Sequence, residues 1–247
     1  MFLGAKIAVV MPAYNEADKI AAAIAAVPAL VDVLVVIDDA SRDDTASCAA
    51  MAPHQVGVCE VISHAQNGGV GASLSTGYAQ VLARHPDVDV IAVMAGDGQM
   101  HGDDLPSLLA PVVEGVADYA KGNRFEGDAV WREMPRTRQV GNIVLSLATR
   151  AAVGYDVFDS QCGYTAISRR MLQRLPIAQL YPRYGYPGDL LGLLAARRAR
   201  VVDVPVRPVY GQNWRSGISP KAALHPLPFL LARAAVRARA PWRRGVR

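Results

Sequence analysis

Short apolar runs alternate with alanine-rich stretches along the first half of the chain. The runs are rich in β-branched residues and cover residues 6–11, 33–38, 56–62 and 88–94. The stretches between and after them have helical spacing and cover residues 17–27, 43–52, 70–84 and 103–115. Near-continuous apolar strands that alternate with helices are typical of a parallel sheet covered on both faces. The pattern therefore predicts an α/β fold built on a mostly parallel sheet.

The second half of the chain is less regular, but it contains no repeat and no low-complexity linker. We expect, in order, a helix, a strand or turn, a helix and a strand at residues 139–152, 162–168, 189–198 and 200–206. Residues 121–140 are polar and aromatic without a clear period, which predicts a mobile loop. A chain of 247 residues accommodates one such domain. We place it over residues 1–221, followed by a basic tail over residues 222–247.

Hydropathy and cysteine content limit the cellular setting. No apolar run reaches the roughly 20 residues needed to cross a bilayer. The apolar start of the chain meets an acid at Glu16, so it reads as a first strand rather than a signal peptide. The three cysteines are odd in number and lack metal-ligand spacing, which argues for a reducing compartment without a disulfide framework. We expect a cytoplasmic protein or one attached peripherally to the inner face of the membrane.

Positive charge is concentrated at the end of the chain. Nine Lys and Arg residues and no acid follow Asp203, although the whole chain carries a net charge of only +4. From Pro226 onward a short apolar stretch is followed by arginines and Trp242, which predicts an interfacial amphipathic helix on an anionic membrane surface. The alternative is a helix packed on the domain with a solvated basic face. We expect no nucleic-acid partner, because no aromatic stacking platform or recognisable binding motif accompanies the charge.

Polar residues gather in three loops that follow predicted strands. These loops read PAYNEAD, DDASRDD and AGDGQMHGDD, and they begin at residues 12, 38 and 95. Ligands of open parallel sheets bind at the carboxyl ends of the strands. The three loops therefore predict a binding site on one edge of the sheet.

Seven blocks, in this order and spacing, resemble those of glycosyltransferase family 2. They are VVMPAYNEADKI, VVIDDASRDDT, NGGVGASLSTGY, MAGDGQM, KGNRF, FDSQCGYTAIS and YGYPGDLLGLL. The resemblance implies an inverting, sugar-nucleotide-dependent enzyme of the GT-A fold, with a Rossmann-like sheet. The most similar branch is that of the polyprenyl-phosphate transferases, such as dolichyl-phosphate-mannose synthase. Its R-x-x-G-x-S-K-like segment is approximated here by RSGISPK at residues 215–221.

The resemblance implies a nucleotide site on the first three blocks. Glu16 and Asp39 would contact the nucleoside, and the residues that line the pocket would be Pro12, Ala13 and Tyr14. Glu16 has the alternative of a helix N-terminal charge, and Asp39 that of an Asx turn. The glycines of the third block either approach the ligand or make a tight strand–helix connection.

A metal site is implied at Asp97 and Gln99. They match the second acid and the downstream glutamine of the family pattern, whereas Ala95 stands where the first acid would be. One carboxylate can suffice for Mg²⁺ or Mn²⁺ when substrate phosphates and water complete the shell. We therefore expect a reduced site in which the donor's diphosphate supplies more of the ligands. The alternative is a Gly-Asp-Gly turn without a metal.

Two later acids are candidates for the catalytic carboxylate. By the resemblance we favour Asp159 and place Asp189 second, with a helix N-cap as the alternative for Asp189. A hydroxyl acceptor needs a general base, whereas a phosphate acceptor is already ionised and needs only positioning. Arginine suits bidentate phosphate binding, and the candidate basic residues for donor or acceptor phosphates are Arg124, Arg136, Arg138, Arg215 and Lys221.

The sequence thus predicts a divalent-metal-assisted inverting glycosyltransferase. Its donor would be a UDP- or GDP-sugar, and its acceptor a polyprenyl phosphate or another lipid or glycan. One alternative is a catalytically silent sugar-nucleotide-binding or scaffold protein, with Ala95 as the lost ligand. A second is a sugar-1-phosphate nucleotidyltransferase, which is disfavoured because PAYNE stands where that class has a glycine-rich, Arg-containing loop. The sequence does not specify the nucleotide, the sugar or the oligomeric state.

Overall fold

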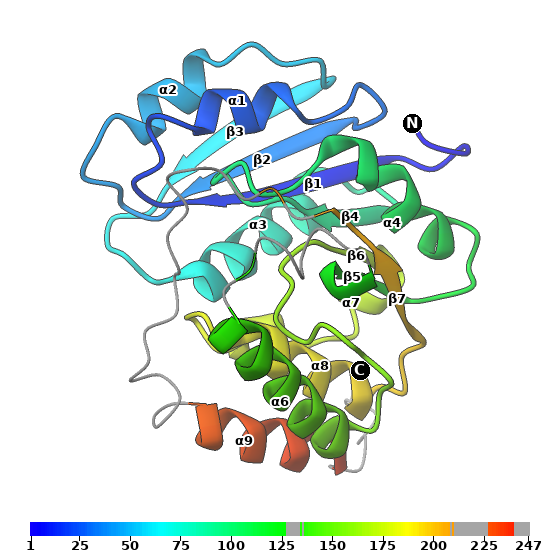
Figure 1. Ribbon diagram of the computed structural model, residues 1–247. Helices are drawn as coiled ribbons and strands as arrows, with labels where there is room; N and C mark the ends of the chain where they lie inside the picture. The colour runs from blue at the N-terminus through cyan, green and yellow to red at the C-terminus, as the bar shows by residue number, and fades with distance from the viewer. Residues whose placement is uncertain (127–133, 135, 208, 210–226, 240–247) are drawn as a thin grey trace.

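A seven-stranded sheet forms the centre of the molecule (Figure 1). The computed structural model describes residues 1–126, 134, 136–207, 209 and 227–239. The strand order is β3-β2-β1-β4-β6-β5-β7, and only β6 runs antiparallel to its neighbours. The strands are β1 Ile7–Ala13, β2 Val33–Asp38, β3 Val58–Ser63, β4 Val90–Val93, β5 Tyr119–Asn123, β6 Thr165–Ser168 and β7 Val201–Pro205. The α/β class and the mostly parallel sheet predicted from the sequence are confirmed.

Helices cover both faces of this sheet. The α-helices are α1 Ile20–Ala25, α2 Thr45–Met51, α3 Val70–Arg84, α4 Leu105–Val113, α6 Arg136–Val153, α7 Arg169–Leu172, α8 Tyr186–Ala196 and α9 Leu227–Arg239. Short 3₁₀ helices are η1 Gly102–Asp104, η2 Arg124–Glu126 and η3 Ile177–Gln179. One apolar core lies between the sheet and α1, α2 and α4, and the other lies between the sheet and α3, α7 and α8. This double coverage explains why β1 and β2 are apolar at nearly every position.

Strand β5 corrects the prediction of a mobile loop over residues 121–140. Residues 121–123 belong to this fully buried strand, and residues 136–140 open α6. The sequence YAKGN does not show the apolar pattern of a buried strand, because it contains the buried polar residues Lys121 and Asn123. Pairing with β6 on one side and β7 on the other stabilises a strand that its own composition does not predict.

Helix α9, the part of the predicted tail that the structure describes, packs against α8 and α6 (Figure 1). Leu230 and Ala234 are buried, and a Cβ placed on Gly192 of α8 would lie 2.8 Å from the Cα of Ala234. For residues 227–239 the structure therefore agrees with the alternative of a helix packed on the domain. Membrane binding by the tail stays a prediction, and Trp242 lies outside the described residues. In the described parts of the chain, no helix is long and apolar enough to cross a membrane.

Candidate active site

The ends of β1, β2 and β4 are tied together by backbone hydrogen bonds. The N–H of Asp39 donates to Ala13 O (2.9 Å), and the N–H of Gly96 donates to Pro12 O (3.0 Å). Pro12 and Ala13 are themselves buried in β1, whereas Tyr14 is 41% exposed at the sheet edge. The strand ends thus bring the predicted nucleotide-site residues to one edge. Of these three residues Tyr14 has the exposed side chain, and the predicted pocket role of all three stays a prediction.

Asp97 and Glu16 lie near each other at this edge. Burial raises the pKa of Asp97, and the carboxylate of Glu16 raises it further, while the N–H of Gln99 donates to Asp97 Oδ1 (3.0 Å) and opposes the shift. Lys19 pairs with Glu16 (2.7 Å). A partly desolvated carboxylate beside a second carboxylate is an arrangement that a divalent cation stabilises.

The described residues contain no ready-made metal centre of three or more His, Cys, Asp or Glu side chains. Asp97 alone follows β4, because Ala95 replaces the first acid of the pattern. Mg²⁺ and Mn²⁺ accept one or two carboxylates together with phosphate oxygens and water. The residues present therefore fit a cation that arrives with, or is completed by, a diphosphate.

The carboxylate of Asp39 holds the glycine-rich loop in place. Asp39 is 3% exposed and accepts from the N–H groups of Gly68 (to Oδ1, 2.9 Å) and Gly69 (to Oδ2, 2.7 Å). Nδ1 of His64 lies 2.8 Å from Asp39 Oδ1, and Nε2 of His64 lies 2.9 Å from Thr76 Oγ1. One lone pair of Oδ2 is still available to a ligand after these bonds. His64 carried no signal in the sequence, because its partner lies 25 residues away.

The glycine-rich block packs closely against residues 181–182, and its predicted contact with a ligand stays a prediction. Gly69 has φ +91°, and a Cβ on it would lie 2.7 Å from Pro182 O. A Cβ on Gly71 would lie 2.0 Å from Tyr181 O, and the N–H of Ala72 donates to Pro182 O (3.0 Å). These glycines allow another backbone segment to approach the start of α3.

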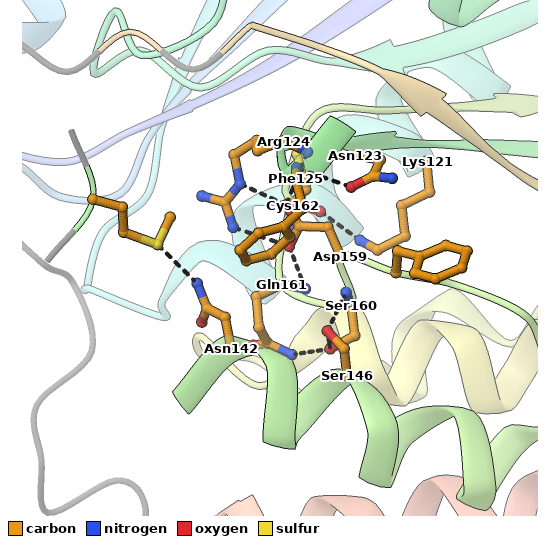
Figure 2. A network of polar contacts seen from close by, with 12 residues as sticks. Lys121, Asn123, Arg124, Phe125, Asn142, Ser146, Asp159, Ser160, Gln161 and Cys162 are labelled. Atoms are coloured by element: carbon orange, nitrogen blue, oxygen red, sulfur yellow. Dashed lines mark hydrogen bonds and ion pairs between the residues drawn. The ribbon is translucent and has the colours of Figure 1, made fainter. Parts of the chain in front are cut away.

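Asp159 forms a buried ion pair with Arg124 (Figure 2). Nε of Arg124 donates to Oδ2 (2.6 Å) and its NH2 group donates to Oδ1 (3.0 Å), while the N–H of Cys162 also donates to Oδ1 (3.1 Å). Burial acts to raise the pKa of Asp159, but the charge and hydrogen bonds of Arg124 outweigh it and hold the pKa below its ordinary value. Asp159 is therefore an ionised carboxylate that orients a guanidinium.

The segment that carries Asp159 is fixed to α6 and β5 (Figure 2). The N–H of Ser160 donates to Ser146 Oγ (3.0 Å) on α6, and Nζ of Lys121 donates to Cys162 O. Burial lowers the pKa of Lys121 and raises that of the Cys162 thiol. A buried thiol with a raised pKa suits a packing residue better than a nucleophile.

Asp189 pairs with helix α9. It is fully buried, Arg233 Nε donates to its Oδ1 (3.0 Å), and Arg237 NH1 lies 3.2 Å from its Oδ2. The predicted alternative of an N-cap is wrong, because Gly185 occupies that position and Asp189 lies in the first turn of α8. Sequence reasoning missed these two arginines because the partners are 44 and 48 residues apart.

The remaining basic candidates are only partly described. Arg136 is exposed at the first residue of α6. The side chain of Arg138, and all of Arg215 and Lys221, lie outside the described residues. Their predicted roles at phosphates stay predictions.

A cleft of about 530 Å³ lies beside the Asp159–Arg124 pair, between α6, η2 and Phe158. Its apolar wall includes Ile143 (37% exposed), Leu147 (56%) and Phe158 (54%), and Val140 and Val144 continue the same apolar stripe on α6. The polar and charged residues that line the rest of it are Asn123, Glu126, Ser146 and Arg150. Arg150 lies over the ring of Phe158, 4.8 Å from its centroid, at one side of the cleft. The i, i+3, i+4, i+7 spacing of residues 140–147 was the signal in the sequence that could have identified this stripe.

Comparisons with known proteins show which family and which relatives this chain is similar to. The family model described as "Glycosyl transferase family 2" matches residues 8–175. A UDP-N-acetylglucosamine–dolichyl-phosphate N-acetylglucosaminyltransferase of Methanococcus voltae is 27% identical over 81% of this chain and 84% of its own length. A polyprenol monophosphomannose synthase of Mycolicibacterium smegmatis is 30% identical over 80% of this chain and 75% of its own. These matches agree with the glycosyltransferase prediction rather than the nucleotidyltransferase alternative.

A solved structure has the same fold. It is glucosyl-3-phosphoglycerate synthase of Mycobacterium tuberculosis in complex with Mn²⁺, UDP and phosphoglyceric acid, with 24% identity and a TM-score of 0.68. The match covers 96% of this chain and 80% of that one. The predicted GT-A fold is thereby confirmed.

The half-buried Asp203 gives a prediction of pH-dependent stability. Asp203 is the register partner of Lys121, its Oδ1 is buried without a hydrogen-bond partner, and burial raises its pKa to about 6. The folded protein therefore binds more protons than the unfolded chain between about pH 4 and pH 6, and this group's contribution to stability falls as pH rises through that window. We expect Asp203→Asn to raise the free energy of unfolding near pH 7 by roughly 1 kcal/mol, after allowance for partial solvent screening.

Denaturant unfolding of both proteins at several pH values checks this prediction. The gain should shrink as pH falls from about 6 toward 4 and vanish below the ordinary pKa of 3.8, where Asp203 is protonated in the folded and unfolded states alike. Glu114→Gln is the matched control, because Glu114 is an exposed acid whose charge is not among the causes that shift the pKa of Asp203. A gain that is independent of pH would contradict the assignment.

Proposed function

Because the chain belongs to glycosyltransferase family 2, we propose that it transfers a sugar from a UDP- or GDP-sugar to a polyprenyl phosphate with inversion, assisted by Mg²⁺ or Mn²⁺. The observation that carries the acceptor class is the apolar cleft beside a buried Arg–carboxylate pair. The names of the Methanococcus and Mycolicibacterium relatives, which refer to dolichyl phosphate and polyprenol monophosphomannose, support the same class.

The donor would bind at the ends of β1, β2 and β4. Tyr14, Glu16 and the remaining lone pair of Asp39 would meet the nucleoside. Asp97, with Gln99 beside it, would hold the divalent cation. When bound, that cation would neutralise the diphosphate leaving group. The glucosyl-3-phosphoglycerate synthase, described with Mn²⁺ and UDP in its complex, supports a metal and a nucleotide on this fold.

The acceptor would place its phosphate near Arg124 and its prenyl chain in the apolar cleft. A phosphate oxygen is already ionised and needs no general base to attack the anomeric carbon. Asp159 would then serve by holding the guanidinium of Arg124 toward the phosphate, in the bidentate geometry that it has here. The basic tail, of which α9 exposes Phe229 and Val236, would bring the enzyme to an anionic membrane where such acceptors reside.

The test is transfer from radiolabelled UDP- and GDP-sugars to prenyl phosphates, with Mn²⁺ or EDTA. Formation of an organic-soluble prenyl phosphate sugar that depends on Mn²⁺ is the expected result. Nucleotide binding without transfer to any prenyl phosphate would favour a catalytically silent sugar-nucleotide-binding protein, an alternative that Ala95 keeps open.

The cleft yields a prediction of its own. Leu147→Asp places a charge on the apolar wall, so we expect the KM for a long-chain prenyl phosphate to rise by about tenfold or more, since it opposes burial of several methylene groups. The Kd for UDP or GDP should not change. Val116→Asp is the matched control, because Val116 is equally exposed (59%) but does not line the cleft. Equal effects of the two variants would remove the cleft from the acceptor site.

A further inference from the structure

Residues 177–182, which comprise η3 and the start of its connection to α8, are held on one side by helix α9. Arg233 NH2 and Arg237 NH2 both donate to Gln179 O (2.7 and 2.9 Å). Both arginines also pair with the buried carboxylate of Asp189, and Asp189 Oδ2 in turn accepts from the N–H of Tyr181 (2.8 Å). One carboxylate therefore links two residues of α9 to the backbone of this segment.

On its other side the same segment lies against α3. Pro182 O accepts from the N–H of Ala72 (3.0 Å), and Ile177 O accepts from Ser75 Oγ (3.1 Å). The contact is close enough that a Cβ on Gly71 would lie 2.0 Å from Tyr181 O. Residues 177–182 thus form a bridge of backbone between α9 and the first turns of α3.

The start of α3 is also connected to the proposed donor pocket. Gly68 and Gly69, which precede the helix, donate to both oxygens of Asp39. The bridge therefore leads from α9 to the start of α3, directly after the two glycines that hold Asp39 in the proposed donor pocket.

We propose that Asp189, Arg233 and Arg237 are positioning residues for the donor pocket, so that docking of α9 and binding of the nucleotide stabilise each other. The inference rests on the proposed function, because it takes the Asp39 edge as the donor site. Its physical basis is a continuous series of hydrogen bonds and ion pairs from α9 through Asp189 and Pro182 to α3 and Asp39. Coupling between two sites is reciprocal, so either partner can report it.

Hydrogen exchange of the unaltered chain tests the coupling. Exchange of the α9 amides is measured without ligand, with UDP and Mn²⁺, and with GDP and Mn²⁺. Whichever nucleotide binds is expected to slow α9 exchange by about fivefold or more, while α4, which the bridge does not touch, serves as the internal reference. Unchanged α9 exchange in the nucleotide-saturated protein would overturn the inference. Failure of both nucleotides to bind would overturn the proposed function, and the inference with it.

Substitution of Asp189 tests the same link from the other end. Asp189→Asn removes the charge that α9 docks on, so we expect the donor Kd and KM to rise by about fivefold or more with little change in kcat. A fall in kcat at unchanged KM would instead make Asp189 a catalytic residue and contradict the positioning role. Unchanged values of both would contradict it as well.

Matched variants separate positioning from loss of folding. Arg233→Gln tests the link if Asp189→Asn does not fold, because Arg237 still pairs with Asp189 in that variant. Arg233→Lys should restore part of the affinity, since it keeps the charge. Arg239→Gln, on the exposed end of α9, should bind the nucleotide as the unaltered protein does. Equal affinity of Arg233→Gln and Arg239→Gln would also count against the inference.

Discussion

Replacement of Asp97 by alanine is expected to abolish metal-dependent donor binding. Asp97 follows the end of β4, and Ala95 stands where the family pattern has its first acid. Glu16, the carboxylate whose charge acts on Asp97, already pairs with Lys19. We expect the Mn²⁺-dependent affinity for UDP or GDP to fall by at least about 100-fold, because a bound cation contributes several kcal/mol to charge stabilisation.

Calorimetric titration of nucleotide with and without Mn²⁺ measures this effect. Asp103→Ala is the control, because Asp103 lies in the same loop with its side chain 90% exposed. Asp97→Ala should also lose the difference between Mn²⁺ and EDTA, while any metal-independent affinity survives. If its Mn²⁺-dependent affinity matched that of Asp103→Ala, Asp97 would not be the metal ligand.

The parts of the fold that follow from local pattern could be predicted from the sequence. Strands β1 and β2 are buried on both faces and are therefore apolar at almost every position. Helix α3 occupies residues 70–84, the predicted range, because glycines precede it and its periodicity is regular. The loops after β1, β2 and β4 predict a binding site for a similar reason. Parallel strands end at the same edge of the sheet, so polar loops that follow them lie together.

Other features depend on partners distant in the sequence and could not be predicted from local pattern. Strand β5 contains a buried lysine, and its formation is explained by the pairing of the strand with β6 and β7. The sequence predicts Asp189 as a catalytic residue or an N-cap, yet its partners are on α9. The same holds for Asp39. The sequence predicts that it contacts the nucleoside, but does not predict its hydrogen bonds to Gly68 and His64. In each case a tertiary contact determines what the polar group does.

Replacement of Asp159 by asparagine is expected to reduce turnover far more than donor binding. The asparagine side chain would have the same shape but no charge, so the guanidinium of Arg124, whose side chain is 17% exposed, would lose its anion. The new amide could also present N–H groups to the N–H groups of Arg124. We expect kcat to fall by about 100-fold or more, and the free energy of unfolding to fall by about 3 kcal/mol, as for other broken buried pairs.

The pKa of Asp159 determines how this stability loss depends on pH. The pKa of its carboxyl is lowered in the folded protein, so the contribution of the pair is fully present above the ordinary value of 3.8 and is lost as pH falls through the lower, folded value. The difference in stability between the unaltered protein and Asp159→Asn should therefore be constant from about pH 5 to pH 8, unlike that of Asp203→Asn. Denaturant unfolding at these pH values measures it.

A double-mutant cycle with Arg124→Gln separates the chemical role of the pair from its structural role. The double variant leaves neither charge unpaired, so it should recover much of the stability that Asp159→Asn loses. It should not recover turnover, because it lacks the guanidinium that we propose to bind the acceptor phosphate. Arg124→Lys should also turn over slowly, since an ammonium cannot reproduce the two parallel bonds to Asp159. Turnover by Asp159→Asn at the rate of the unaltered enzyme would show that the pair serves folding alone, and the acceptor phosphate would then have to be held by other basic residues.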